Sequence, residues 1–143
     1  ETPGLRTLEV PVVYGGEYGP DLTWVAEYHR LSPEEVVRLH REITYQVYMI
    51  GFTPGFAYMG ELPDTLITPR KETPRISVPR GSVAIAQSQT GVYPVESPGG
   101  WQIIGRTPLS FFDPANWPPT PLEMGDRVKF FSVQEEEITL WDG

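Results

Sequence analysis

"RISVPRGSVAIAQSQTGVYPVESPGGWQIIGRT", residues 75–107, contains four short runs of strand-forming residues separated by turn residues. The runs are RISVP (75–79), SVAIAQ (82–87), GVYPVE (91–96) and WQIIGRT (101–107). Isoleucine, valine and aromatic residues favour strands, whereas the Gly, Pro and Ser residues between the runs favour tight turns. Short strands at this spacing are typical of a β-sandwich or a closed β-barrel.

The sequence on either side of this stretch adds three predicted strands and two predicted helices. The strands are at residues 5–16, 45–52 and 126–133. One helix is predicted at 19–29 and a second at 31–44, where Ser32 and Glu35 occupy the N-cap and third helical positions of a capping box. We therefore predict a mostly β protein, a closed β-barrel with two short helices, built as one domain over residues 1–143.

The composition excludes several classes of function. The formal net charge of −8 argues against binding to nucleic acid or to an anionic membrane. The absence of cysteine rules out disulfides and thiolate chemistry, and with only two histidines no metal site is expected. No apolar run is long enough to cross a bilayer, and no signal peptide or glycine-rich phosphate-binding loop is recognisable. We expect a cytoplasmic protein.

Arginine follows proline three times at five-residue spacing within residues 68–81. The three arginines are Arg70, Arg75 and Arg80, and they make this segment positive in an acidic chain. Proline stiffens the backbone, and a guanidinium group matches the geometry of a carboxylate or a phosphate. The alternative is that they serve solubility and structural salt bridges. We predict that at least one of the three binds an anion.

Two further polar residues are candidates for acid or base chemistry. Glu17 lies in the glycine-rich stretch YGGEYGPDL, residues 14–22, where the backbone permits close approach of a ligand. The alternative for this stretch is a turn that leads into a helix. His40 lies next to the apolar face of the second helix and is the histidine more suited to titrate. A packed, hydrogen-bonded histidine is the alternative there.

Neutral hydrogen-bonding groups and aromatic rings occur together in residues 86–108. Gln89 and Tyr93 are suited to bind a small ligand that bears an amide. A hairpin whose aromatic side chains fill the barrel is the alternative, and we assign Trp101 to the core.

The stretch GFTPGFAYMGELP, residues 51–63, combines aromatic side chains with turn residues. A core strand would avoid Pro54 and Gly55, and a surface loop would avoid Phe56 and Tyr58. We interpret the stretch as a rigid aromatic wall of a pocket, with Pro54 and Gly55 holding a turn.

Five segments in this order resemble one known family: YGGEYGPDL, GFTPGFAYMGELP, TPRKETPRISVPRGSVAIA, TGVYPVESPGGWQIIGRTP and MGDRVKF. They resemble the C-terminal domain of the allophanate hydrolase subunit 1 family. That family includes the B subunit of 5-oxoprolinase and an inhibitor of a sporulation histidine kinase, and a similar module occurs in the carboxyltransferase region of urea carboxylase. The resemblance implies a single cyclophilin-like β-barrel domain, without the N-terminal domain that family members usually carry.

The resemblance also implies a function and partners. The chain is expected to belong to a heteromeric ATP-dependent amide hydrolase, either 5-oxoprolinase, which converts 5-oxoproline to glutamate, or an allophanate hydrolase-like enzyme. Its expected partner is a sister cyclophilin-like subunit, of the type found as the C subunit of 5-oxoprolinase or as allophanate hydrolase subunit 2, with ATP used in the assembled complex. The alternatives are a regulatory module that inhibits a sensor histidine kinase and a carboxyltransferase half acting on a urea-derived substrate. Prolyl isomerase activity is not expected, because fold does not imply function.

These expectations assign roles to eight residues. The predicted catalytic residues are Glu17, His40 and Arg75. The predicted residues for binding the small amide substrate are Phe56, Tyr58, Arg70, Gln89 and Tyr93. No residue is assigned to ATP or to a metal.

Overall fold

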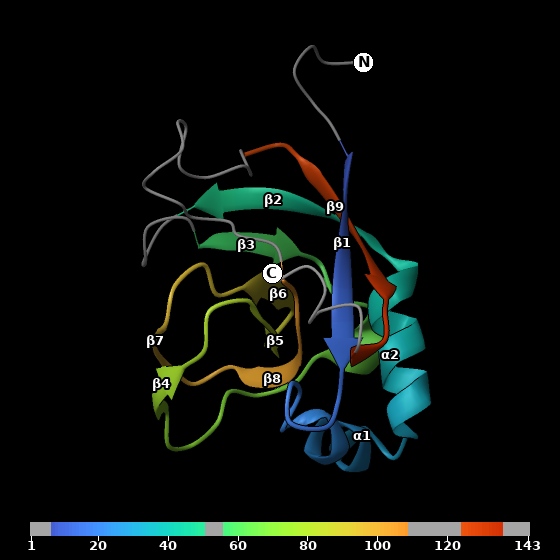
Figure 1. The fold of residues 1–143 in the computed structure, drawn as a ribbon. Coiled ribbons are helices and arrows are strands. Elements are labelled where there is room, and N and C mark those ends of the chain that lie inside the picture. Colours follow the sequence, from blue (N-terminus) through green and yellow to red (C-terminus); the bar gives the residue numbers. More distant parts are fainter. Residues whose placement is uncertain (1–6, 51–55, 109–123, 136–143) are drawn as a thin grey trace.

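Seven strands form a closed barrel in the computed structural model, which describes residues 7–50, 56–108 and 124–135 (Figure 1). Around the barrel the strands are β1 (Thr7–Tyr14), β8 (Gln102–Arg106), β5 (Ser82–Ala86), β6 (Gln89–Val92), β3 (Ala57–Gly60), β2 (Thr44–Ile50) and β9 (Arg127–Ser132). Neighbouring strands are antiparallel except β1 and β9, which run parallel and close the barrel. The predicted mostly β fold with a closed barrel is confirmed.

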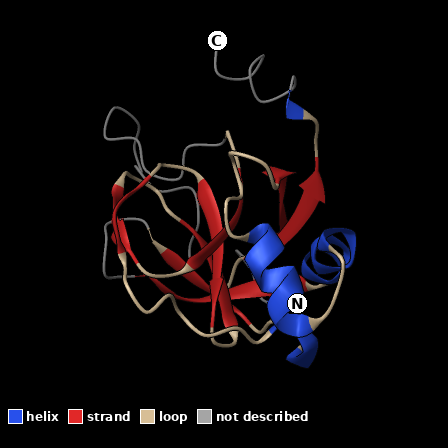
Figure 2. Ribbon diagram, turned by 90° about the horizontal axis from the view of Figure 1, so that it is seen from below, coloured by secondary structure: helices blue, strands red, loops and turns tan. Residues whose placement is uncertain are grey.

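Two helices pack beside each other against the barrel (Figure 2). They are α1 (Leu22–His29) and α2 (Pro33–Glu42), and a short 3-10 helix, η1, covers Asp64–Leu66. The predicted capping box of α2 is present: the Glu35 N–H donates to the Ser32 hydroxyl at 3.1 Å, and the Ser32 N–H donates to the Glu35 carboxylate at 2.9 Å. These bonds satisfy amide groups that a helix start leaves without partners. Among the described residues, neither helix has the length and apolarity needed to cross a membrane.

A two-stranded antiparallel sheet lies outside the barrel and consists of β4 (Arg75–Val78) and β7 (Ser97–Gly99). It covers the outer face of β5, so that β5 is buried on both of its faces and a second apolar layer forms. Val83 and Ile85 of β5 belong to the main core with the helices, whereas Ala84 and Ala86 belong to a second cluster that contains Val78 of β4. Successive side chains of a strand point to opposite faces, which explains this division. We call the two-stranded sheet the β4–β7 ribbon.

One predicted strand is wrong, and strands that were not predicted are present. The run GVYPVE, residues 91–96, is not one strand: β6 ends at Val92, a bend follows, and β7 begins at Ser97. Pro94 has no N–H to donate to a neighbouring strand, which accounts for the break. The strand β3 was not predicted, because turn residues dominate its surroundings. The turn assigned to Pro54 and Gly55 lies outside the described residues.

Candidate functional site

Four aromatic side chains form a cluster between the barrel and the β4–β7 ribbon. Phe56 lies at its centre, and its ring centroid is 5.1 Å from that of Tyr93 and 5.3 Å from that of Trp101. Both contacts are edge-to-face, a preferred arrangement of aromatic pairs. The fourth ring, Tyr58, lies 4.9 Å from Phe56 and is only half-buried. The predicted aromatic wall is therefore present at Phe56 and Tyr58, and Trp101 is buried, as assigned.

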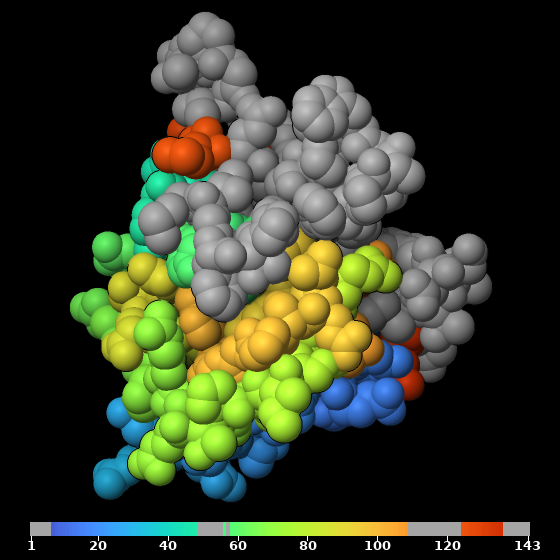
Figure 3. Space-filling view, turned by 90° about the vertical axis from the view of Figure 1, so that its left-hand side faces the viewer, coloured from blue at the N-terminus to red at the C-terminus, as the bar shows by residue number. Residues whose placement is uncertain are grey.

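This cluster forms the floor of an open cavity of about 360 Å³. Its lining residues are Phe56, Tyr58, Arg70, Lys71, Pro74, Tyr93, Pro98, Gly99, Gly100 and Trp101. The segments near residues 70–75 (lime green) and 97–101 (yellow to orange) lie side by side on the face drawn in Figure 3. We call this cavity the aromatic pocket. The structure thus brings four of the predicted substrate-binding residues, Phe56, Tyr58, Arg70 and Tyr93, into one place.

The aromatic pocket offers both a hydrogen-bonding group and positive charge. Burial raises the pKa of Tyr93, so its hydroxyl keeps its proton at neutral pH. Arg70 is exposed and Lys71 half-buried, and both line the pocket. An apolar floor with a few polar groups is the usual design of a small-molecule site.

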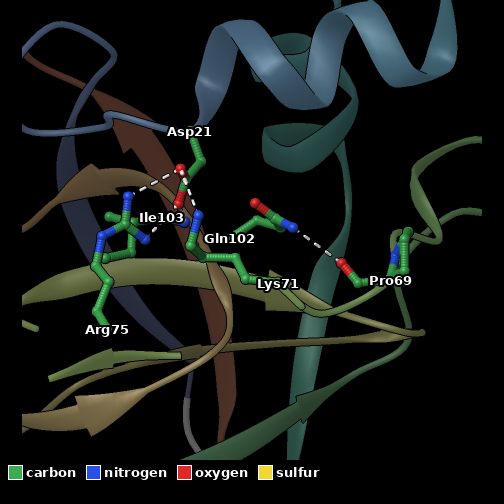
Figure 4. Close-up of polar contacts among 6 residues, drawn as sticks. All are labelled: Asp21, Pro69, Lys71, Arg75, Gln102 and Ile103. Carbon is green, nitrogen blue, oxygen red and sulfur yellow. Dashed lines mark hydrogen bonds and ion pairs between the residues drawn. The ribbon is translucent and has the colours of Figure 1, made fainter. Parts of the chain in front are cut away.

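A buried aspartate holds the charged segment in place (Figure 4). Asp21 is 6% exposed and accepts two hydrogen bonds from the Arg75 guanidinium, at 2.8 and 2.9 Å. It also accepts one from the Ile103 N–H at 2.7 Å, and its carboxylate lies 3.9 Å from the Lys71 ammonium. The hydrogen bonds to Asp21 raise the pKa of Arg75. Arg75 therefore pairs with a carboxylate of its own chain. A structural salt bridge of this kind was the alternative to ligand binding for the three arginines.

Two more hydrogen bonds attach residues 69–75, which we call the cationic segment. The side-chain amide of Gln102 donates to the Pro69 carbonyl at 3.1 Å. The Lys71 N–H donates to the Gly100 carbonyl at 2.7 Å. With the Asp21 ion pair, these bonds fix the segment to β8 and to the start of α1, so the position of Arg70 at the aromatic pocket depends on several distant parts of the chain.

His40 lies in the core and not at the aromatic pocket. Its Nδ1 is 2.8 Å from the Tyr14 hydroxyl and its Nε2 is 3.0 Å from the Thr90 hydroxyl. Because Thr90 donates its own proton to the Ala84 carbonyl at 2.9 Å, it accepts from Nε2–H, and Tyr14 donates to Nδ1. Burial lowers the pKa of His40 to about 3. His40 is thus neutral, and both of its nitrogens have hydrogen-bond partners, as expected for a histidine packed in the core. The catalytic role of His40 stays a prediction.

The buried His40 is expected to make stability fall with decreasing pH. The unfolded chain binds a proton at this histidine near pH 6.5, whereas the folded chain binds it only near pH 3, so protons favour the unfolded state between these values. From pH 7.5 to pH 5 the free energy of unfolding should fall by about 2 kcal/mol. Urea denaturation across this range measures the effect. Burial also lowers the pKa of His29, so this histidine contributes in the same direction, and the decrease should shrink less in His29→Gln than in His40→Gln. An unchanged decrease in His40→Gln would contradict the assignment.

Comparison with known families identifies the type of domain. Residues 1–122 match the family described as "Carboxyltransferase domain, subdomain C and D". The chain belongs to this family. As a carboxyltransferase C–D domain, it is 54% identical to the B subunit of 5-oxoprolinase from Bacillus subtilis over 132 residues, which are 92% of this chain and 55% of that relative. The chain therefore spans about half the length of this relative.

Two other comparisons extend the relationship of this carboxyltransferase C–D domain. A conserved uncharacterized protein from Pyrococcus horikoshii has the same fold, with a TM-score of 0.89 and 52% identity over 92% of this chain and 61% of its own. A putative urea carboxylase of Emericella nidulans is 24% identical over 92% of this chain and 11% of its own length. The resemblance noted from the sequence motifs is confirmed.

Two other predicted site residues lie apart from the aromatic pocket of the carboxyltransferase C–D domain. Glu17 is exposed and lines a different cavity, together with Ser132 and Glu135. Gln89 begins β6 and hydrogen-bonds to the Tyr48 hydroxyl. Neither residue lines the aromatic pocket, so their predicted roles have no geometric support from it. Among the described residues, no group of three or more His, Cys, Asp or Glu side chains is placed to hold a metal ion.

Sequence reasoning missed three residues of this site. Asp21 lies in the glycine-rich stretch 14–22 and is not among the residues to which the sequence assigns a role, but its side chain makes no capping bond and reaches Arg75 instead. Lys71 and Trp101 were not assigned to a site. The surplus of positive charge in residues 68–81 was the one available signal that a buried acidic partner exists.

Proposed function

We propose that this domain forms part of the B-type subunit of a heteromeric ATP-dependent amide hydrolase whose substrate is 5-oxoproline. The observation that carries the proposal is the aromatic pocket, an apolar floor with Arg70 at its edge. The 54% identity to a protein named as the B subunit of 5-oxoprolinase supports the choice of substrate. Two alternatives stay predictions from the sequence resemblance. They are a regulatory module that inhibits a sensor histidine kinase and a carboxyltransferase half that acts on a urea-derived substrate.

The substrate matches the pocket in its chemistry. 5-Oxoproline is a small lactam ring with one carboxylate. The ring packs against the aromatic floor, and the carboxylate pairs with the Arg70 guanidinium. The Tyr93 hydroxyl, which keeps its proton, is a donor for the amide carbonyl. These residues bind and orient the substrate; the described part of the pocket lining supplies no carboxylate or imidazole as a base.

The sister subunit is the proposed partner that completes the site. The described residues leave the aromatic pocket open on one side, and water must be excluded for charged groups to act strongly on a bound substrate. A second subunit lying over the pocket would provide that exclusion and the missing acid–base groups.

The glycine-rich stretch 14–22 does not fit the phosphates of ATP. The Gly15 N–H donates to the Ile104 carbonyl at 3.0 Å, and a side chain at Gly19 would overlap that same carbonyl. The absence of side chains at Gly15 and Gly19 therefore lets this stretch pack closely against β8, and it does not make room for a ligand. The neighbouring Glu17 and Glu135 carry charge of the same sign as a phosphate. ATP is assigned to the assembled complex, and we derive no step through it in this chain.

Replacing Arg70 with alanine tests the proposal. The KM for 5-oxoproline should rise at least about tenfold, because a charge-assisted hydrogen bond contributes roughly 1.5–3 kcal/mol. The measurement is 5-oxoproline-dependent ATP hydrolysis by the complex of the full-length B-type protein with its partner. Arg80→Ala is the matched control, because Arg80 also follows a proline but is exposed and lies outside the aromatic pocket. Equal KM values for the two variants would refute the role of Arg70.

A further inference from the structure

A second cavity lies on the other side of the cationic segment, between that segment and α1. It has a volume of about 650 Å³ and shares Arg70 and Lys71 with the aromatic pocket. Trp24 and Tyr28 of α1 line it, as does Gln102 of β8. We call it the α1 cavity. Nothing in the proposed amide hydrolysis uses its aromatic side.

The aromatic side of the α1 cavity is not part of the core. Trp24 and Tyr28 lie one helical turn apart, and their rings stack with centroids 5.2 Å apart and planes inclined by 17°. They are 45% and 53% exposed, whereas the face of α1 that packs on the barrel consists of Leu22, Val25 and Ala26. In a stacked pair the outer face of a ring is a flat apolar surface on which another planar ring can stack, and both rings line the α1 cavity.

The opposite side of the α1 cavity carries polar groups in fixed positions. Gln102 is 3% exposed, and its amide nitrogen is committed to the Pro69 carbonyl. Figure 4 shows the amide oxygen of Gln102 turned away from Pro69, on the side of α1. Among the described residues no donor is found for this oxygen, so it is available to accept a hydrogen bond from a ligand.

The charge around the α1 cavity suits a small anion. Arg70 and Lys71 are positive and Glu72 is negative, while Asp21 is already paired with Arg75. The balance is one positive charge, which matches a monophosphate or carboxylate better than a triphosphate. The cationic segment places these charges opposite the aromatic pair.

We propose that the α1 cavity binds a planar heteroaromatic ring that carries an amino group and a single anionic group, as in a purine nucleoside monophosphate. The ring stacks on the Trp24–Tyr28 pair, and the ring amino group donates to the Gln102 amide oxygen. The phosphate pairs with Arg70 and Lys71. The cavity volume lies within the range of small-molecule sites. The α1 cavity shares Arg70 with the proposed 5-oxoproline site, but nucleotide binding is measured without amide hydrolysis.

Titration of the isotope-labelled chain with AMP, followed by NMR, tests the proposal. The indole N–H signal of Trp24, assigned with Trp24→Phe, should shift and saturate. Tyr28→Ala and Arg70→Ala should each weaken AMP binding at least about tenfold, which corresponds to 1.4 kcal/mol. Tyr48→Ala and Arg80→Ala are matched controls, because Tyr48 is 43% exposed and neither residue lines the α1 cavity. IMP, which lacks the amino group, should bind more weakly than AMP.

Three results would overturn the proposal. One is the absence of a saturable Trp24 shift at AMP concentrations up to about 10 mM, well above the range of a weak specific site. The second is equal binding of ribose 5-phosphate and AMP, which would indicate a simple anion site. The third is AMP binding that Tyr28→Ala leaves unchanged. Each is measured without catalysis, so failure here is distinguishable from failure of the amide hydrolase proposal.

Discussion

Replacing Asp21 with alanine is expected to lower the free energy of unfolding by about 3 kcal/mol, because it removes one member of a largely buried ion pair. The substitution leaves the Arg75 guanidinium and the Ile103 N–H without the acceptor they share. The Arg75 side chain is 26% exposed, so water compensates in part, and the lower end of the range for buried pairs applies. Urea denaturation monitored by circular dichroism measures the change.

Two variants separate the ion pair from a general effect of charge. Glu72→Ala is the matched control, because Glu72 is an exposed acidic residue of the same cationic segment. It should change the free energy of unfolding by less than about 0.5 kcal/mol. The double substitution of Asp21 and Arg75 should be less damaging than the sum of the two single substitutions, because the pair is coupled. An Asp21→Ala protein as stable as Glu72→Ala would contradict the account.

Replacing Gly99 with alanine is expected to damage both the fold and the aromatic pocket. A β-carbon at Gly99 would overlap the Tyr93 hydroxyl oxygen and come within 2.8 Å of a ring carbon of Tyr93. That ring is 1% exposed and packs against Phe56, so it has no free space to enter. Overpacking of this kind costs about 1–3 kcal/mol. The displaced ring should also weaken binding of the proposed substrate, measured as a raised KM for 5-oxoproline in the assembled complex.

The neighbouring glycine provides a control for the effect on stability. A β-carbon at Gly100 would meet Pro74 at 3.6 Å, an ordinary contact distance. Gly100→Ala should therefore leave the thermal midpoint close to that of the unsubstituted protein. If Gly99→Ala unfolds at the same temperature as Gly100→Ala, Tyr93 is not held as tightly as the structure indicates.

The helices were predictable because their signals are local. Ser32 and Glu35 lie three residues apart and complete their capping box without help from the rest of the chain. Most strands were predictable from runs of valine, isoleucine and aromatic residues. The exceptions, β3 and β7, contain or adjoin glycine and proline, and they form because a neighbouring strand is there to pair with them.

The candidate site was predictable only in part, because it depends on contacts between distant residues. The aromatic character of Phe56 and Tyr58 and the charge of Arg70 were visible in the sequence. The pairing of Asp21 with Arg75 spans 54 residues and has no local signature. The burial of His40 was equally hidden, since a histidine beside an apolar stripe is compatible with either a core position or a site.

The parallel pairing of β1 with β9 has a consequence for how the protein is made. Thr7 pairs with Arg127 and Val12 with Ser132, so the barrel closes between strands near opposite ends of the described chain. During synthesis, the edge of β1 that pairs with β9 stays unpaired until more than a hundred later residues have been added. Contacts of such long sequence separation form late and slow the folding step. Closure of the barrel is therefore expected only after the ribosome has released β9, and nascent chains that stop before it remain open and prone to aggregate.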